Sequence, residues 1–396
     1  MRALVCGAGI AGLAAAHRLH THGWQVTVLE QAPGPRTQGY MIDFFGPGYQ
    51  AADLMGLLPR LRELGYHIDH ATFVDHHGTP RATLGIQQLS HLGMVSLMRP
   101  DLERALRETL PDDVQVHYDA PLRQVHHHGD TVQATLADGR TLTGDLLIGA
   151  DGIHSTVRRL LWGPDTDHLR YLGFHTAAFT FTDPRIHARV DGGFYLTDTT
   201  GAQMGLYGLR DGRVAAFTVH RSPTPRTPAD PRAELRRTHA DLGWLVPRAL
   251  EHCPDPEHVY YDQVAQTLTP HWSRARTVLL GDACGAVSLL AGQGASLAVG
   301  GAFILAEHLA SAPTLEAGLR RYEQQWRPEV EQRQRAARRT ARWFLPPTRA
   351  RLLLRRAALH TTGLPGVSRL LAGVLTGKPT PAVREHTPLG ATGRTR

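Results

Sequence analysis

The amino-acid sequence predicts an α/β protein with a Rossmann-like dinucleotide-binding domain, an antiparallel β-sheet inserted into that domain, and a C-terminal helical segment. Three observations predict this class. A glycine-rich turn joins an apolar strand to a helix at the N-terminus, residues 165–268 alternate apolar and polar side chains between turns, and an arginine-rich stretch with a helical pattern follows residue 315. The 396 residues suffice for two or three domains.

The first segment places glycines where a dinucleotide site needs them. A short apolar strand runs into Gly7-Ala-Gly9-Ile-Ala-Gly12, a helix follows, and a second strand ends at Glu30. In such a turn the first glycine allows the tight bend, the second lets the backbone approach a pyrophosphate, and the third lets helix and strand pack closely. Because an acid at the end of the second strand binds a ribose and disfavours a 2′-phosphate, we expect FAD or NAD here, and not NADP.

Two aspartate–glycine motifs follow later in the chain. Residues 145–158 begin with an apolar strand, which runs into Asp151-Gly152, and continue into a helix capped by Ser155 or His154. Residues 276–283 form another buried strand that ends at Gly281-Asp282, before a glycine-rich loop and a helix to about residue 309. Each pair alone is also explained as a turn, since these residues are common turn formers.

Together, the order and spacing of the three motifs resemble the class A flavoprotein monooxygenases, the p-hydroxybenzoate hydroxylase-like family, over roughly residues 1–330. Gly39-Tyr-Met-Ile-Asp43 and Met98-Arg99-Pro-Asp-Leu-Glu103 resemble most the tetracycline-inactivating and polyketide-tailoring branch. The resemblance implies a glutathione reductase-type FAD-binding domain. It also implies a single-component monooxygenase that uses FAD, NADPH or NADH, and O2 to hydroxylate an aromatic or polyketide-like molecule through a flavin C4a-hydroperoxide.

The resemblance also implies which residues contact the cofactors. The FAD pyrophosphate would lie against Gly7, Gly9 and Gly12, and the adenosine ribose against Glu30. Arg99, at the start of the helix predicted over Pro100–Leu110, would reach FAD near its ribityl-phosphate part, Gly281-Asp282 would bind the ribityl chain, and Asp43 would lie against FAD. Asp151 is tied to both FAD and the nicotinamide, and Arg36 to NADPH.

The loop Gly292-Gln293-Gly294 would lie beside the isoalloxazine, at the N-terminus of the 295–309 helix. Bare N–H groups there would stabilise the negative charge of reduced flavin. The chain departs from the family pattern nearby, with Cys284-Gly285 in place of Ala-His and Leu289 in place of a proline. Two interpretations stay open: neutral subfamily variation, or a rebuilt flavin face with altered nicotinamide or oxygen handling.

The alternating strands of residues 165–268 predict an antiparallel substrate domain whose one face covers a cavity above the flavin. We expect His175, Tyr195, Tyr207 and His220 to point into it, with His175 or His220 as the base and the tyrosines as substrate contacts. Each is also explained as a packed or solvent-facing strand residue. The predicted boundaries are 1–164 for the first part of the FAD-binding domain, of which 66–97 adds to the sheet, 165–268 for the substrate domain, and 269–314 for the return segment.

Residues 315–380 are predicted to be helical, and 381–396 to be a disordered tail. Residues 318–358 contain twelve arginines and only three glutamates, a composition that suits a basic helix lying on a membrane or nucleic acid. A helix packed across the domains is favoured instead, with Trp326, Trp343, Phe344 and Leu352–Leu354 buried. The reason is that arginine replaces lysine throughout the chain, whose only lysine is Lys378.

The remaining composition excludes several other classes. Three cysteines without short spacing predict no disulfide framework or metal site and suit a reducing cytoplasm. The apolar N-terminus and residues 283–306 are interrupted by glycines, so we expect buried cofactor-binding segments and no integral membrane segment. We expect a small-molecule substrate, no nucleic-acid partner, and a monomer or dimer.

Other flavin chemistries are weighed on single residues. With its sole lysine at Lys378 and no Trp-x-Trp, the chain lacks the residues on which flavin halogenases depend. Cys6 lies inside the first strand, so noncovalent FAD is preferred. The alternatives that remain are an FAD-dependent oxidoreductase acting on a lipid-like or polycyclic substrate without oxygen insertion, and a non-enzymatic FAD-binding protein.

Overall fold

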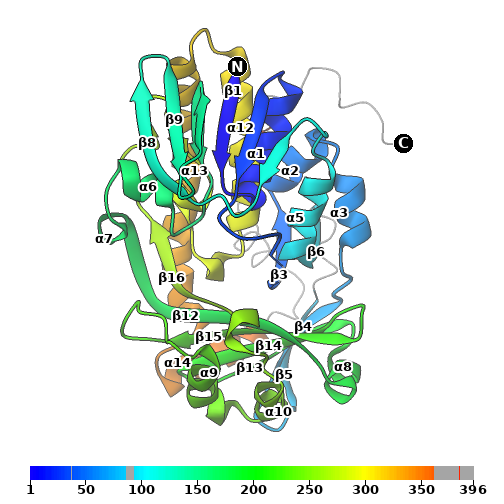
Figure 1. The fold of residues 1–396 in the computed structure, drawn as a ribbon. Coiled ribbons are helices and arrows are strands. Elements are labelled where there is room, and N and C mark those ends of the chain that lie inside the picture. The colour runs from blue at the N-terminus through cyan, green and yellow to red at the C-terminus, as the bar shows by residue number, and fades with distance from the viewer. Residues whose placement is uncertain (37, 86–92, 361–382, 384–396) are drawn as a thin grey trace.

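The computed structural model describes residues 1–36, 38–85, 93–360 and 383. Figure 1 shows a mixed α/β fold in which a parallel sheet with its helices lies over a second, larger sheet. The predicted tail lies outside the described residues apart from Val383, as do residues 361–380 of the predicted helical region and residues 86–92 of the segment assigned to the substrate sheet.

The first sheet is the Rossmann-like core. It has six strands in the order β17-β18-β11-β1-β2-β7, parallel except for β17. Its strands are β1 (Arg2–Cys6), β2 (Gln25–Leu29), β7 (Gln115–His117), β11 (Leu146–Gly149), β17 (Ser273–Arg274) and β18 (Thr277–Leu279). The central strands are apolar on both faces because both faces are covered, which is typical of parallel sheets.

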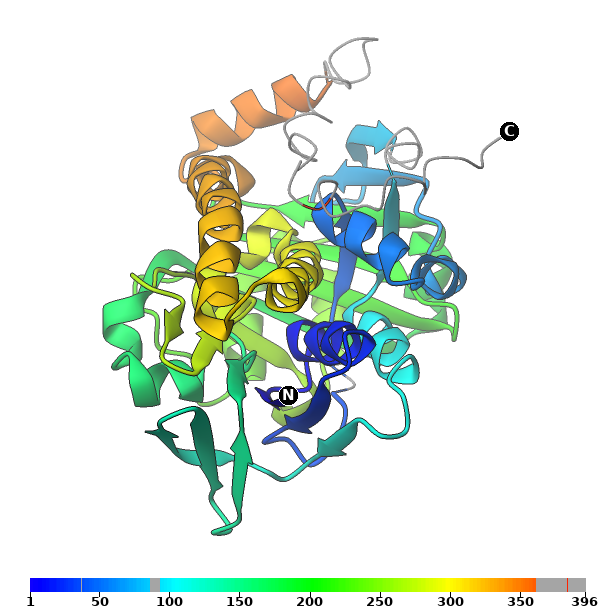
Figure 2. The ribbon, with the colours of Figure 1, turned by 90° about the horizontal axis from the view of Figure 1, so that it is seen from above.

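Helices cover one face of this sheet and a small sheet covers the other (Figure 2). The helices of this part are α1 (Ile10–Thr21), α2 (Pro47–Leu54), α3 (Leu58–Leu64), α5 (Arg99–Glu108), α6 (Thr156–Leu161), α7 (Asp165–His168), α11 (Asp282–Gly285) and α12 (Gly294–Ser311), with the 3-10 turn η3 (Leu289–Ala291) before α12. The small sheet has the order β10-β9-β8, with β8 (Leu122–His128), β9 (Thr131–Leu136) and β10 (Thr141–Gly144). A separate pair, β3 (Met41–Phe45) and β6 (Met94–Met98), links this part to the larger sheet.

The larger sheet has seven strands in the order β16-β12-β15-β14-β13-β4-β5. They are β4 (His70–Val74), β5 (Pro80–Gly85), β12 (Leu169–Thr182), β13 (Gly193–Asp198), β14 (Ala202–Gly208), β15 (Arg213–Arg221) and β16 (Tyr260–Thr267). All neighbouring pairs are antiparallel except β13 with β4, which are parallel. Its far face packs against helices, which are α8 (Pro184–Val190), α9 (Pro231–His239) and α10 (Val246–Glu251), with the 3-10 turns η1 (Ala240–Leu242) and η2 (Pro256–His258).

Two helices follow α12. The long helix α13 (Leu315–Phe344) packs along α12, where Gly300 and Gly301 leave room for the ring of Trp326. Helix α14 (Arg349–His360) begins after Pro346-Pro347 and attaches to the larger sheet, where Arg355 and Arg356 pair with Asp198.

The expected buried stripe of this region is partly wrong. Trp326 and Leu352 are buried, but Leu353 and Leu354 are 63% and 60% exposed, because only one side of α14 meets the sheet. The side chains of Trp343 and Phe344 lie outside the described ones.

Helix α12 is the one described helix long and apolar enough to cross a membrane by length and composition. Its mean hydropathy is 1.2, and 67% of its residues are buried within the protein, against α1, α2 and α13. Its apolar character is therefore accounted for by its position in the core.

Candidate active site

The N-terminal glycines form a cradle of backbone between β1 and α1. A Cβ at Gly7, which has φ +105°, would lie 2.5 Å from the carbonyl oxygen of Ala150, and a Cβ at Gly12 would lie 1.9 Å from that of Gly7. Both positions therefore require glycine for close packing inside the protein. Gly9 differs, because its nearest neighbours would be the side chains of Glu103 and Arg99 at 3.5 and 3.9 Å. The side of Gly9 where a Cβ would stand therefore faces a recess that contains the Arg99 guanidinium.

Two carboxylates fix the loops that border the cradle. Glu30, at the end of β2, accepts hydrogen bonds from the backbone N–H groups of Ala8 (2.8 Å) and Ala32 (2.9 Å). Asp151, after β11, accepts from the Ser155 hydroxyl (2.5 Å) and the Val157 N–H (3.0 Å). Burial raises the pKa of Asp151. Its carboxylate holds the first turn of α6, whose N-cap is Ser155.

A recess with mixed charge lies next to Gly9. Arg99 begins α5, and its guanidinium pairs with Glu103 one turn later at 2.7 Å. Burial alone would lower the pKa of Arg99, but Glu103, Tyr40, Tyr260 and Asp282 together outweigh it and raise the pKa, so Arg99 stays cationic. Asp282 is accessible to solvent, yet desolvation by the surrounding protein raises its pKa, with Arg99 opposing the rise. Accessible carboxylates that are nevertheless desolvated line a recess.

Asp43 lies in a similar setting on β3. Solvent reaches its side chain, yet desolvation by the surrounding protein raises the pKa of Asp43. The Ser96 hydroxyl of the paired strand β6 donates a hydrogen bond to the Asp43 carboxylate at 2.6 Å. Arg36 is exposed and lies close enough to Glu103 for its charge to lower that residue's pKa, against the larger effect of burial.

The loop before α12 reaches the same recess. A Cβ at Gly294 would lie 3.8 Å from the Asp282 carboxylate, so the start of α12 and the start of α11 meet there. Gly292 is in the left-handed conformation, φ +64°, which turns the chain into the helix. The Gln293 side chain accepts a hydrogen bond from Arg333 of α13 at 2.6 Å, and Arg333 also pairs with Glu329.

Aromatic residues close the recess on the side of the larger sheet, and only Tyr40 among them falls in a motif of the sequence analysis. The ring of Tyr40 lies 5.7 Å from that of Phe217 on β15 and 5.5 Å from that of Tyr260 on β16. Burial raises the pKa of Tyr40, and the charges of Arg99 and Asp282 also act on it. Tyr260 falls within residues 165–268, which the sequence assigns to an antiparallel sheet, but that assignment does not indicate its neighbours.

Asp262, two residues further along β16, was also missed. It pairs with His154 of the Asp151-Gly152 segment at 3.1 Å, which raises the pKa of His154. Its charge acts on Asp282. The larger sheet therefore supplies an acid to the rim of the recess.

The predicted orientation of three residues on the larger sheet is wrong. His175 and His220 are opposite each other in the register of β12 and β15, and both hydrogen-bond the Tyr261 hydroxyl, at 3.0 and 3.1 Å. His220 also faces His239 and Glu234 of α9, and burial lowers its pKa to about 4. They lie on the helix-covered face, since strand alternation cannot tell which face meets the cofactor part.

Tyr195 lies on the same helix-covered face, and Tyr207 lies on the other. Tyr195 contacts His70 (3.2 Å) and Trp244 in the cluster beneath the sheet. The Tyr207 hydroxyl accepts from the Met41 N–H at 2.6 Å and packs with Met98, against β3 and β6. Tyr207 is only 1% exposed, so it joins the two parts of the protein.

The departure at residue 285 has a packing explanation. A Cβ at Gly285 would lie 2.7 Å from the Val330 side chain of α13, so glycine lets α13 lie close to α11. Cys284 is buried and burial raises its pKa, so it is a neutral thiol. Leu289 begins η3, which Ser288 caps with its side chain. Any side chain at 285, histidine included, would require Val330 to shift.

Comparison with known proteins identifies the family. The family model described as "FAD binding domain" matches residues 1–337. The chain belongs to this family. It is 34% identical to an uncharacterized protein of Mycobacterium tuberculosis over 341 residues, 84% of this chain and 91% of that one. It is 30% identical to a flavin-dependent monooxygenase from an unknown prokaryotic organism, over 84% of this chain and 87% of that one.

A solved structure of a similar protein supports the same family. The crystal structure of tetracycline destructase Tet(55) is 28% identical and superposes with a TM-score of 0.78, covering 91% of this chain and 96% of that chain. The resemblance to the class A flavoprotein monooxygenases is therefore confirmed, and the chain is an enzyme of that class.

The residues in the recess fit FAD, the cofactor of the family. The cradle of Gly7 and Gly12 has no room for a side chain, Gly9 is open toward a cation, and these are the needs of a pyrophosphate. The start of α12 supplies N–H groups near Asp282.

Proposed function

We propose that the protein is an FAD- and NAD(P)H-dependent monooxygenase that hydroxylates an aromatic or polyketide-like small molecule. One observation carries the proposal: the Gly9 and Asp282 recess meets an aromatic cluster, Tyr40, Phe217 and Tyr260, where the two sheets adjoin. Rings prefer to pack against rings in offset or edge geometries, so a planar substrate suits this cluster. Residues 165–268, together with β4 and β5, would form the substrate-binding part.

The chain's own residues would bind and orient FAD. Gly7, Gly9 and Gly12 would admit the pyrophosphate, and Arg99 would balance its charge, as Glu103 already holds the guanidinium in place. Glu30 would meet the ribose with the oxygen lone pairs that Ala8 and Ala32 leave unused. Bound FAD would supply the redox chemistry, accepting hydride from a nicotinamide and activating O2 for transfer of one oxygen atom to the substrate.

The protein would also tune charge and exclude water at the flavin ring. The N-terminus of α12 would stabilise negative charge there, and the bond from Arg333 would fix Gln293 at that terminus. Tyr40, Phe217 and Tyr260 would keep the site apolar. Arg36, exposed at the rim, would meet the nicotinamide cosubstrate.

No histidine of the larger sheet is assigned as the base. His175 and His220 face α9 on the far side of the sheet, so proton transfer from a phenol or enol would need another group. His154 pairs with Asp262 at 3.1 Å, and the charge of Asp262 acts on Asp282 of the recess. We propose that this pair, and not the sheet histidines, shapes any pH dependence of turnover.

The test is to purify the protein with FAD and screen phenolic and polycyclic compounds for faster NAD(P)H oxidation. A compound that stimulates oxidation and gains one oxygen atom from 18O2 supports the proposal. Conversion without 18O would favour the alternative, an FAD-dependent oxidoreductase acting on a lipid-like or polycyclic substrate.

Matched variants test the aromatic cluster in the same screen. Phe217→Leu removes a ring on the recess side of the larger sheet, and Phe181→Leu removes one on its helix-covered side. Only the first should raise KM for the aromatic compound. Equal effects of the two would mean that the cluster does not bind substrate.

A further inference from the structure

Helix α14 exposes neighbouring apolar side chains on the outside of the protein. Leu353 and Leu354 are 63% and 60% exposed, and among the described residues only two other large apolar side chains, Met1 and Leu160, are exposed. Figure 2 shows α14, in orange, at the periphery of the molecule, beyond the end of α13. Single exposed apolar residues are common on protein surfaces, whereas neighbouring ones on one helix face mark a contact site.

Charge holds the helix in this orientation. Arg355 and Arg356 both pair with Asp198 of β13, Arg356 at 2.7 Å. The Arg355 guanidinium also lies over the Phe73 ring, 5.3 Å from its centroid. Turning the leucines inward would take both arginines away from Asp198, which is buried, and a buried carboxylate without a partner is costly. The way in which α14 binds the sheet therefore leaves the leucines outside.

The exposed side of α14 has an apolar centre between two arginines. At 3.6 residues per turn, Ala350 lies between Leu353 and Leu354 around the helix, and Arg349 and Arg351 lie on the two edges of this strip. All five residues are exposed. This is the pattern of a helix that lies in a membrane interface, where apolar side chains point to the acyl chains and arginines reach the lipid phosphates.

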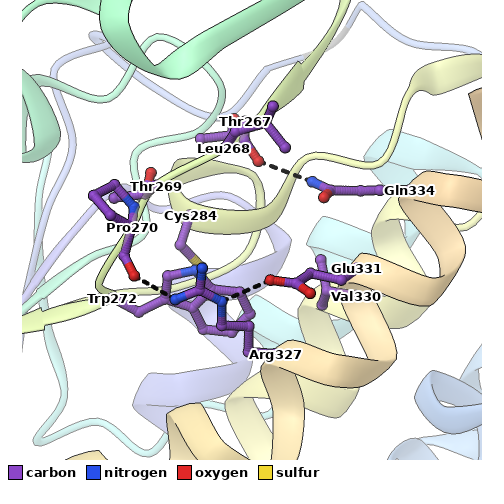
Figure 3. Close-up of a pocket in the computed structure, with 10 residues that line it drawn as sticks. All are labelled: Thr267, Leu268, Thr269, Pro270, Trp272, Cys284, Arg327, Val330, Glu331 and Gln334. Carbon is purple, nitrogen blue, oxygen red and sulfur yellow. Dashed lines mark hydrogen bonds and ion pairs between the residues drawn. The ribbon is translucent and has the colours of Figure 1, made fainter.

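The charge of these two arginines has no acid beside it on the helix. Arg327 of α13 shows the usual arrangement, since it donates to Glu331 one turn later at 2.8 Å (Figure 3). In contrast, residues 332–384 contain no aspartate or glutamate, so α14 offers no acidic partner to Arg349 or Arg351. The exposed side of α14 is therefore both apolar and positively charged.

The size and charge of this side favour a lipid surface over a macromolecule. A stable protein–protein interface uses about 20–30 residues on each side, far more than one helix face offers. A nucleic acid would contact the arginines through its phosphates and leave the leucines in water. A bilayer with anionic lipids uses both, since its acyl region accepts the leucines and each arginine near its surface contributes roughly fivefold in affinity.

We propose that α14 binds the protein to the surface of membranes that contain anionic lipids. Leu353 and Leu354 insert below the headgroups, and Arg349 and Arg351 pair with lipid phosphates. The contact is peripheral, because the 12 residues of α14 are too few to span a bilayer. It does not depend on the proposed reaction, since it uses no residue of the recess.

The experiment measures sedimentation of the full-length, FAD-loaded protein with vesicles of phosphatidylcholine and phosphatidylglycerol, and with vesicles of phosphatidylcholine alone. Leu353→Ser combined with Leu354→Ser removes the apolar strip and keeps the charge. Leu160→Ser is its control, since Leu160 is an exposed leucine of α6.

A second pair of variants tests the charge. Arg349→Gln combined with Arg351→Gln removes two positive charges from α14. Arg185→Gln combined with Arg189→Gln, at two exposed arginines of α8, makes the same change in net charge elsewhere.

The parent should sediment with the anionic vesicles and much less with phosphatidylcholine alone. The leucine pair should weaken binding roughly tenfold to hundredfold, and the α14 arginine pair roughly tenfold to thirtyfold. Both controls should bind like the parent. All the substituted side chains are exposed, so the variants should keep the unfolding midpoint of the parent in urea.

Four results would overturn the proposal. The first is no sedimentation with the anionic vesicles, and the second is equal binding by the parent and the leucine pair, which would mean attraction by charge alone. The third is tighter binding to a DNA duplex that the leucine pair leaves unchanged, which would assign the face to nucleic acid. The fourth is a dimer in analytical ultracentrifugation that the leucine pair dissociates, which would assign the leucines to a second copy of the chain.

Discussion

Gly9→Ala should separate folding from cofactor binding. Gly9 has extended backbone angles that alanine tolerates, φ −82° and ψ −174°, and the added Cβ would lie 3.5 Å from its nearest neighbour, an ordinary contact. We therefore expect the free energy of unfolding without FAD to change by less than about 1 kcal/mol, the scale of a weaker N-cap.

The effect on FAD should be larger, because the methyl group would stand where the pyrophosphate approaches the backbone. Overpacking of this kind costs roughly 1–3 kcal/mol, which corresponds to roughly fivefold to 150-fold weaker binding. Fluorescence titration of apoprotein with FAD measures it. Gly34→Ala, at a glycine with no atom within 4 Å of an added Cβ, is the control and should bind like the parent.

Two outcomes would refute this reasoning. If Gly9→Ala binds FAD as tightly as Gly34→Ala does, the open side of the cradle is not the pyrophosphate site. If Gly9→Ala instead loses its folded state, the packing around the cradle is tighter than the 3.5 Å contact indicates.

Three further predictions concern stability. Ser155→Ala should lower the free energy of unfolding by about 2–4 kcal/mol in urea denaturation, because it removes the N-cap of α6 and a donor to the desolvated carboxylate of Asp151; a loss below about 0.5 kcal/mol would contradict this. Gly285→Ala should cost about 1–3 kcal/mol from overpacking, and Val330→Ala in the same chain should recover part of it; strict additivity of the two would contradict the contact. His220 has a folded pKa of about 4 against the usual 6.5, so stability that is full above pH 6.5 should be lost as pH falls toward 4, by up to about 3 kcal/mol, and His220→Gln should flatten this profile; parallel profiles would contradict it.

The sequence predicted the parts of the site that depend on backbone. The glycine cradle, the strand before Asp151 and the helix after Gly294 follow from local patterns, since glycine and apolar runs determine turns and strands over a few residues. The break between α13 and α14 likewise falls at Pro346-Pro347, since proline cannot continue a helix.

What required long-range packing was not predicted. The alternation in β12 and β15 predicts that side chains point to two faces of the sheet, but it does not say which face meets the recess. The contact of His220 with His239 of α9 shows that His175 and His220 lie on the other face. Tyr260 and Asp262 come to the recess from β16, whose position beside β12 is set by the sheet order.

The residue at 285 illustrates the same limit. A departure from the family pattern suggested either a neutral change or a rebuilt flavin face. The contact of Gly285 with Val330, 45 residues later in the chain, gives a reason based on helix packing instead.

The central claim is that the recess supports oxygen insertion into a small molecule. The most direct measurement is turnover of the FAD-loaded protein with NAD(P)H under 18O2, using a compound that stimulates NAD(P)H oxidation, followed by mass spectrometry of the product. The account predicts a product heavier by one 18O atom. A product formed at the same rate without 18O would contradict it.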